Sequence, residues 1–556
     1  MSVTSGRPSL TAWTGSVSVP VGNFGAREVR AAGSGPLTER LAVGVAIARR
    51  DRDGFTTNDV TGHDLDYRSA ISGKAQILWT PAANWEARAI VTAERARDGD
   101  LALNDLETLR RNPFHAARDF EGRNDRNILS TTVLARREGQ RFAFSTTTGF
   151  VHWTTRGVTD LDYTPIPLVK RDNAEEDRQF TQEIRLASAA NAPVTLSDAT
   201  VLKWQAGLFL FRQNYDQDAV NTFAPFLLSR FVDFPVSQHS PQSALDDMGA
   251  AAYGLGTLTL NDKLDVTVGA RLDHESKGAT LDTFFSPQIG PPTIVRAEES
   301  FSNVSPQFAM AYHFQPDRMA YASVGRGFKA GGFNPASPAG REAYGEEQAW
   351  HVEGGVKTAW ANGRVVTNAA AFSVDWNDLQ LNLPNPAVPA QFYVANVGGA
   401  RSSGIEIELN ARPQSSVDLF GMFGYTHGRF TEGSVSGGLD VSGNELPSTP
   451  GYTASVGGEY SRALGRAATF HGRAEAVFYG AFQYDDANTA GQEAYSITNF
   501  RTGVRGRRVF VDAWIRNAFD TRYIPIAFAY ASFAPSGFVG ESGAPRTFGF
   551  TGGFTF

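Results

Sequence analysis

The sequence predicts an all-β fold, a large antiparallel transmembrane β-barrel of about 22 strands with short periplasmic turns and long extracellular loops. Three observations lead to this fold class. Side chains alternate in polarity with period 2, connections alternate between short and long, and the chain ends on a phenylalanine-rich strand. One closed barrel also accommodates 556 residues, a length that would otherwise suggest several domains.

The polarity alternation is clearest in residues 264–273, where leucine, valine and alanine alternate with aspartate, threonine, glycine and arginine. Residues 71–79, 85–94 and 404–410 behave in the same way. Strands of a soluble sandwich average roughly 5 to 6 residues. The stretches here reach about 10 residues, which is the length of a tilted strand that crosses a bilayer. The pattern therefore favours a barrel in a membrane.

The connections between these stretches fall into two groups. Tight turns are predicted near residues 38–39, 81–84, 138–140, 261–262, 315–317, 361–363 and 464–466. Longer segments rich in Gly, Pro, Asp and Asn are predicted as loops at roughly 52–66, 97–124, 156–176, 214–243, 277–299, 329–345, 377–391, 431–447 and 521–544. An even strand number places both chain ends on the side of the tight turns, the periplasm.

Composition excludes several other classes of protein. A net charge of −7 without a basic stripe gives no reason to expect nucleic acid as a partner. The absence of Cys excludes disulfides and thiolate chemistry, and no apolar run of about 18 residues could form a membrane helix. The nine His are scattered, and no Gly-x-Ser-x-Gly motif occurs. The sequence therefore gives no reason to expect a metal site, a cofactor or an enzyme.

The last strand carries Phe548, Phe550, Phe554 and Phe556 on one face and ends on the last of them. This ladder looks like the sorting signal that outer-membrane proteins present to the barrel assembly machinery. We therefore expect the cell outer membrane as the location, outer-membrane lipid around the barrel, and the assembly machinery as a partner through Phe556.

From the middle of the chain to its end, several segments resemble TonB-dependent receptor barrels in order and spacing. They are residues 303–307, 321–334, 344–347, 353–357, 396–398, 403–406, 517–523 and 545–549. The resemblance implies a receptor that takes up a scarce nutrient with energy supplied through TonB. A ferric siderophore is the ligand that we expect first.

The start of the chain extends the resemblance, because residues 2–8 are similar to the end of the last strand of the family's plug domain. We expect residues 1–10 to be the remnant of that strand and residues 11–556 to be the barrel. A secretory signal peptide, a TonB-contacting box and the rest of the plug are not found in this sequence. The TonB complex is thus expected as a partner only if a plug and a TonB box are encoded upstream.

Candidate ligand contacts come from loops in which aromatic and cationic side chains adjoin, because this mixture suits a flat anionic chelate. They are Arg326, Phe328, Lys329, Phe333 and Asn334 in one segment and Arg230 in the segment 223–234. The first segment also belongs to the family pattern, so a role in barrel or loop structure is the alternative. Inward charged residues such as Asp512 with Arg516 are interpreted as pairs that solvate a water-filled interior and pair with a plug.

Three alternative functions are consistent with these observations. A barrel of about 22 strands encloses more space than side chains can fill, so a chain without a plug would act as a passive, porin-like channel. The chain could equally be a truncated, inactive fragment of a full receptor. A surface protein that serves as a phage or adhesin receptor is the third alternative.

Overall fold

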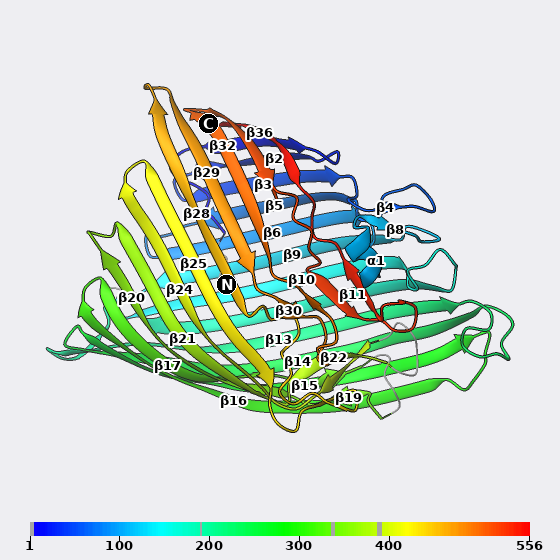
Figure 1. Cartoon of the computed structure of the whole chain (residues 1–556). Helices are drawn as coiled ribbons and strands as arrows, with labels where there is room; N and C mark the ends of the chain where they lie inside the picture. The colour runs from blue at the N-terminus through cyan, green and yellow to red at the C-terminus, as the bar shows by residue number, and fades with distance from the viewer. Residues whose placement is uncertain (1–4, 190–191, 335–339, 386–391) are drawn as a thin grey trace.

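In a computed structural model, which describes residues 5–189, 192–334, 340–385 and 392–556, the chain forms one closed antiparallel barrel (Figure 1). The first strand β1 pairs with β2 on one side and with the last strand β36 on the other. At this seam, Gly15 and Phe556 exchange two backbone hydrogen bonds of 2.9 and 3.0 Å. Each strand of the closed wall is therefore paired on both sides.

The barrel sheet contains 23 described strands. One of them, the four-residue β12, pairs only with β13, and the other 22 form the wall. The wall strands are β1 (Thr14–Gly22), β2 (Arg27–Thr38), β3 (Leu41–Arg52), β5 (Arg68–Trp79), β6 (Trp85–Asp98), β9 (Arg123–Glu138), β10 (Phe142–Asp160), β11 (Val169–Ser188), β13 (Thr200–Phe223), β14 (Val236–Leu260), β15 (Leu264–Ser286), β16 (Thr293–Gln315), β17 (Arg318–Lys329), β20 (Glu347–Trp360), β21 (Val365–Asn377), β24 (Ala400–Gln414), β25 (Val417–Phe430), β28 (Tyr452–Leu464), β29 (Ala468–Tyr479), β32 (Tyr495–Gly506), β33 (Val509–Arg516) and β36 (Thr547–Thr555).

The connections contain short strands and one six-residue helix. The short strands are β4 (Thr57–Asn58), β7 (Asn104–Asp105), β8 (His115–Ala116), β12 (Val194–Ser197), β18 (Gly332–Phe333), β19 (Ala343–Tyr344), β22 (Gln380–Pro384), β23 (Phe392–Asn396), β26 (Val435–Ser436), β27 (Leu439–Asp440), β30 (Phe482–Gln483), β31 (Gly491–Gln492), β34 (Ile526–Ala529) and β35 (Phe538–Glu541). The helix is α1 (Leu106–Arg111), capped by the Asp105 carboxylate, which accepts a hydrogen bond from Thr108 N. Among the described residues, no helix is long and apolar enough to cross a membrane.

The two faces of the wall differ as the alternation predicts. On β15, Val268 and Leu272 point outward and are 58% and 55% exposed, and on β24 the outward Ile405, Ile407 and Leu409 are 41–45% exposed. Large apolar side chains are exposed in the same way on almost every wall strand. In water such a continuous apolar surface would be very unfavourable, whereas a lipid environment matches it.

The predicted tight turns all lie at one end of the barrel, which we call the turn end, and the connections predicted as loops lie at the other end, the mouth. The connection that contains β12 was not predicted and also lies at the turn end. Three predicted loops, at 156–176, 214–243 and 277–299, are mostly strand instead, because β10–β16 extend to 19–25 residues apart from the short β12. Their actual connections are residues 161–168, 224–235 and 287–292. These strand extensions carry polar residues on both faces, so their sequence lacks the period-2 signal although the hydrogen-bonded ladder continues.

The inner wall carries charged side chains, as predicted, but the expected pairing of Asp512 with Arg516 is wrong. The Asp512 carboxylate pairs with Arg501 on the adjacent β32 and lies 2.8 Å from His471 Nε2 on β29. Arg516 instead lies 5.3 Å from the ring of Trp514. Asp512 is directly opposite Gly503, so Arg501 is its diagonal neighbour on β32, roughly 7 to 8 Å away. Arg516 is four positions further along β33, roughly 13 Å away, so the cross-strand partner is favoured.

The described N-terminal segment, residues 5–13, precedes β1 and runs inside the barrel. The carbonyl oxygens of Ser5 and Gly6 accept hydrogen bonds from Arg88 and Gln76 on the inner wall. Arg7 pairs with Glu86 at 3.0 Å. The division into residues 1–10 and 11–556 stays a prediction, and residues 1–4 lie outside the described part of the chain.

Candidate ligand site at the mouth

The mouth is crossed by the last connection, residues 517–546, which contains the hairpin of β34 and β35 (Figure 1). β35 adds β7 as a third strand, through the pairs of Val539 with Asp105 and Gly540 with Asn104. A segment near the end of the chain is thereby joined to the connection between β6 and β9. The helix α1 follows β7 directly, so the pairing of β7 with β35 positions the helix.

A small apolar core holds these connections together. Leu106 and Leu109 of α1 pack with Phe482 of β30 and with Ile524 and Phe538 of the last connection. All five side chains are buried. Three connections that are far apart in the sequence therefore share one core, which gives the mouth a defined shape.

The last connection also contacts two other connections of the mouth. The Tyr530 hydroxyl donates a hydrogen bond to the carbonyl oxygen of Leu161, directly after β10. Its ring lies 5.3 Å from that of Tyr163, and the Phe528 ring lies 5.5 Å from that of Phe392 in β23. Residues 517–546 thus connect several sides of the mouth.

A cavity of about 360 Å³ lies between α1 and the last connection. Its lining combines two guanidinium groups with aromatic rings and a few polar groups. The lining residues are Leu109, Arg110, Pro113, Phe114, Gln492, Glu493, Arg522, Tyr523, Ile524 and Ser542.

The two cationic groups of the cavity differ in their contacts. Arg110 is on α1, where its Nη1 donates to Glu107 at 2.7 Å and its Nη2 donates to the carbonyl oxygen of Gly491 at 2.6 Å. Arg522 is exposed and forms no ion pair with any carboxylate of the described residues. One guanidinium is therefore fixed in place, and the other is free to pair with an anion.

The aromatic side of the cavity is equally ordered. The Tyr523 ring stacks on Tyr495 with 4.6 Å between ring centroids, and Tyr495 stacks on Tyr479 at 4.9 Å. Burial raises the pKa of the Tyr523 phenol, so its hydroxyl stays protonated near neutral pH and can donate a hydrogen bond. Phe114 has a φ of 65°, a backbone conformation that is uncommon for a bulky residue. Such backbone strain is frequent at ligand sites.

A charged cluster supports the neighbouring connection between β6 and β9. The guanidinium of Arg118 is fully buried, lies 3.6 Å from Asp100 Oδ2 and donates to the carbonyl oxygen of Leu101 at 2.9 Å. Burial raises the pKa of Asp100 to about 6, although the charge of Arg118 opposes this shift. Part of this cluster therefore titrates between the ordinary carboxylate range and neutral pH.

None of the six residues predicted from the sequence lines this cavity, although all six lie in described segments. Arg326 and Phe328 share the outward face of β17 with Val324, and Arg326 donates to Gln348 on β20. Lys329 is on the inward face at the end of the same strand, opposite Glu347.

The other three predicted residues lie in connections. Phe333 belongs to β18, and the neighbouring Asn334 is buried, with its amide bonded to backbone groups. Arg230 is exposed in the connection between β13 and β14, with its guanidinium 4.8 Å from the ring of Phe231. Arg230 and the segment 326–334 thus belong to different parts of the chain and do not form one site. The ligand role of all six residues stays a prediction.

Sequence reasoning missed Arg110 and Arg522. Each stands close to an aromatic residue, Phe114 and Tyr523, which is the criterion that selected the segment 326–334. The signal was thus present, but it is common in the chain. Only the packing of α1 against the last connection shows that these two segments face the same cavity.

Known proteins match both the sequence and the fold. A curated relative, the metal-pseudopaline receptor CntO of Pseudomonas aeruginosa, is 24% identical over 310 residues, which are 54% of this chain and 41% of that protein. The chain thus spans about two fifths of this relative's length.

Two solved structures share the fold over nearly the whole chain. The ferric yersiniabactin uptake receptor FyuA from Yersinia pestis has a TM-score of 0.85 at 20% identity, covering 99% of this chain and 81% of that chain. The siderophore receptor PiuA from Acinetobacter baumannii has a TM-score of 0.79 at 14% identity, covering 99% and 82%. At these identities the matches show the fold.

The family model described as TonB dependent receptor-like, beta-barrel matches residues 91–518. The match covers most of the wall strands and extends well beyond half of the 556 residues. The closed 22-strand wall and the packed connections at the mouth agree with this assignment. The chain belongs to the family of TonB-dependent receptor-like β-barrels.

Proposed function

We propose that this chain forms the barrel of an outer-membrane receptor that takes up an anionic metal chelate, first of all a ferric siderophore, with energy supplied through TonB. The observation that carries the proposal is the mouth cavity, in which Arg110 and Arg522 adjoin the rings of Phe114 and Tyr523. Guanidinium groups bind carboxylate and catecholate oxygens by charge-assisted hydrogen bonds, and the rings stack on flat ligand groups. A volume of about 360 Å³ is within the range of small-molecule sites.

The related proteins support this choice of ligand class. FyuA is described as an uptake receptor for ferric yersiniabactin, PiuA as a siderophore receptor and CntO as a metal-pseudopaline receptor. Each of these descriptions refers to a protein that resembles this chain. Two of the three descriptions name a metal-bound compound, and the third names a siderophore.

Binding to the purified chain in detergent tests the site. The probes are ferric citrate and ferric tris(2,3-dihydroxybenzoate), measured by isothermal titration calorimetry. The double variant Arg110→Gln, Arg522→Gln should weaken binding of at least one probe by roughly tenfold or more, since each lost charge-assisted hydrogen bond is worth about that factor. Arg111→Gln, on the same helix but outside the cavity, is the matched control and should bind normally.

Two further variants compare the cavity with the residues predicted from the sequence. If Arg230→Gln or Arg326→Gln weakens chelate binding and the cavity variant does not, the ligand site is elsewhere on the mouth and the cavity assignment is wrong. Uptake by cells that carry the complete gene should stop when TonB is removed. Uptake that continues without TonB would support the passive channel.

The remaining expectations are proposals that rest on the wall and the chain ends. The outward apolar surface supports contact with outer-membrane lipid, and the terminal ladder supports recognition of Phe556 by the barrel assembly machinery. The contacts of residues 5–7 with the inner wall support the proposal that residues 1–10 belong to the end of a plug strand. Attaching the family's plug ahead of residue 1 and measuring chelate uptake would test this division.

A further inference from the structure

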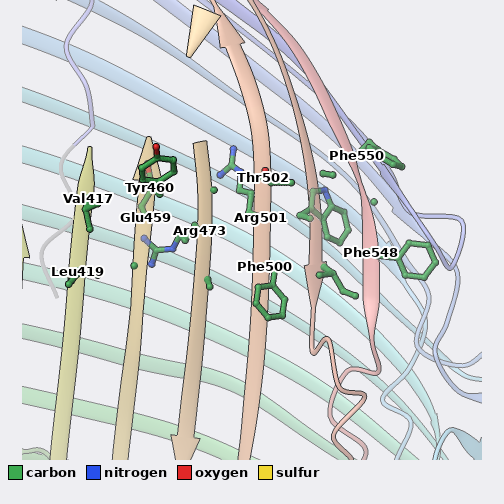
Figure 2. Close-up of a pocket in the computed structure, with 17 residues that line it drawn as sticks. Val417, Leu419, Glu459, Tyr460, Arg473, Phe500, Arg501, Thr502, Phe548 and Phe550 are labelled. Atoms are coloured by element: carbon green, nitrogen blue, oxygen red, sulfur yellow. The ribbon is translucent and has the colours of Figure 1, made fainter. Parts of the chain in front are cut away.

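A second hollow, of about 750 Å³, lies at the turn end of the barrel, on β28, β29 and β32. Its side chains belong to the inner face, because Glu459 and Arg501 alternate along their strands with Tyr460 and Phe500, which point outward and are 43% and 41% exposed. Figure 2 shows Tyr460 and Phe500 beside an apolar groove on the outer side, with Glu459 and Arg501 next to them on the same strands. The wall here is thus apolar outside and strongly charged inside.

The inner hollow, which we call the arginine basin, has an excess of positive charge. Its lining residues are Glu459, Ser461, Ala463, Gly465, Arg466, Ala467, Ala468, Thr469, His471, Arg473, Arg501, Arg505, Gly506 and Arg507. Five arginines therefore face one glutamate within the lining. Two of the five have partners, Arg501 with Asp512 and Arg473 with Glu475 at 2.6 Å.

The other three arginines, Arg466, Arg505 and Arg507, form no ion pair with the carboxylates of the described residues. Arg505 lies 5.4 Å from the ring of Phe510, which holds it near the wall. Like charges that gather without partners raise the free energy of the empty basin. A bound anion would remove this repulsion.

The floor of the basin is built around Asp512, whose side chain is fully buried beneath Arg501 and His471. Space for this carboxylate depends on Gly503, since a Cβ at that position would lie 2.1 Å from Asp512 Oδ1. Asp512 neutralises one arginine and fixes its orientation. The guanidinium of Arg501 is thereby presented to the basin as a fixed donor, while the net charge stays positive.

We propose that the arginine basin binds a small, multiply charged anion with carboxylate or phosphate groups. Several guanidinium groups converge on one hollow whose volume is typical of small-molecule sites. The low-dielectric wall behind the basin concentrates the positive potential and raises the local concentration of anions. This site is separate from the mouth cavity and shares no lining residue with it.

Calorimetry on the complete chain in detergent tests the proposal, with citrate and pyrophosphate as probes in separate titrations. We expect at least one probe to bind, and the double variant Arg505→Gln, Arg507→Gln to bind it roughly tenfold more weakly or worse. Affinity should also fall as NaCl is raised, because the contacts are between charges. The control Arg49→Gln removes an arginine on the outer face of β3 and should leave binding unchanged.

Folding of each variant is checked by its faster migration without heating in SDS gels, so that loss of binding is not confused with loss of the barrel. Failure of both probes to bind the parent chain would overturn the proposal, as would unchanged binding by Arg505→Gln, Arg507→Gln. Binding of a glutamate-rich peptide without binding of either small anion would also overturn it and assign the basin to a polypeptide partner. Variants at Arg110 and Arg522 should leave binding at the basin intact, so the two proposals fail independently.

Discussion

The side chain of Asn334 and the backbone of Val394 exchange two hydrogen bonds across 60 residues of sequence. Asn334 Nδ2 donates to the Val394 carbonyl oxygen at 2.9 Å, and Val394 N donates to Asn334 Oδ1 at 2.8 Å. The same Nδ2 donates to the carbonyl oxygen of Arg341 at 2.9 Å, and the side chain is 3% exposed. The amide therefore joins two connections of the mouth and has little remaining capacity for a ligand.

We expect Asn334→Ala to loosen these connections without opening the barrel. Loss of the amide removes the hydrogen-bond partner of part-buried backbone groups of Val394 and Arg341, at about 1 kcal/mol for each bond. Limited proteolysis and hydrogen exchange of residues 392–396 would measure the effect. Asn382→Ala, at an exposed position of β22, is the control. Unchanged protection of 392–396 in Asn334→Ala would contradict this role.

Closure of the barrel should depend on Gly15. The ring of Phe556 covers this residue so closely that a Cβ at position 15 would lie 2.2 Å from the ring. Gly15→Val should therefore displace Phe556 and lower the folded fraction, measured by gel migration without heating. Gly552→Ala is the matched control, because a Cβ there meets nothing within 4 Å. Equal folding of the two variants would show that the seam tolerates the displacement.

Asp512 should contribute far more to stability than an exposed acidic residue. Asp512→Asn removes the charge of a fully buried side chain that pairs with Arg501 and His471. Breaking a buried pair in this way lowers the free energy of unfolding by about 3–5 kcal/mol. Asp418→Asn breaks the half-exposed pair with Arg412 and should cost roughly 1 kcal/mol or less. Urea unfolding of both variants provides the comparison, and similar losses would contradict the buried-pair interpretation.

The mouth should become more stable as the pH falls toward 5. Burial raises the pKa of Asp100 from 3.8 to about 6, so between these values the folded state binds more protons than the unfolded state. Stability then decreases as the pH rises through this window. Hydrogen exchange of residues 101–106, corrected for its intrinsic pH dependence, should show more protection at pH 5 than at pH 7.5. Protection that increases with pH would refute the assignment.

The fold could be predicted from the sequence because a barrel wall imposes a strict two-residue period. Ile405, Ile407 and Leu409 face outward as expected, and so do Phe548 and Phe550 of the last strand. The period fails where both faces of a strand are polar, as in the extensions of β10–β16, and those segments resemble loops in sequence.

The candidate site could not be predicted in the same way. Arg110 and Arg522 are more than 400 positions apart, and their shared cavity depends on the pairing of β35 with β7 and on the core around Leu106. Such long-range packing leaves no periodic trace in the sequence. Residues within one segment, such as Arg326 and Phe328, could be selected by composition, but composition did not show that both face outward on β17.

The contact of Tyr530 with Leu161 has a consequence for the order of folding. Its two partners are 369 residues apart, and the connection that carries Tyr530 lies between the last two wall strands. Contacts of such sequence separation cost more loop-closure entropy than local contacts, and pairing of the intervening strands lowers that cost. The mouth therefore reaches its final shape only in the last steps of assembly, after the strands that surround it have inserted. A barrel stalled before that stage would expose an unfinished binding surface.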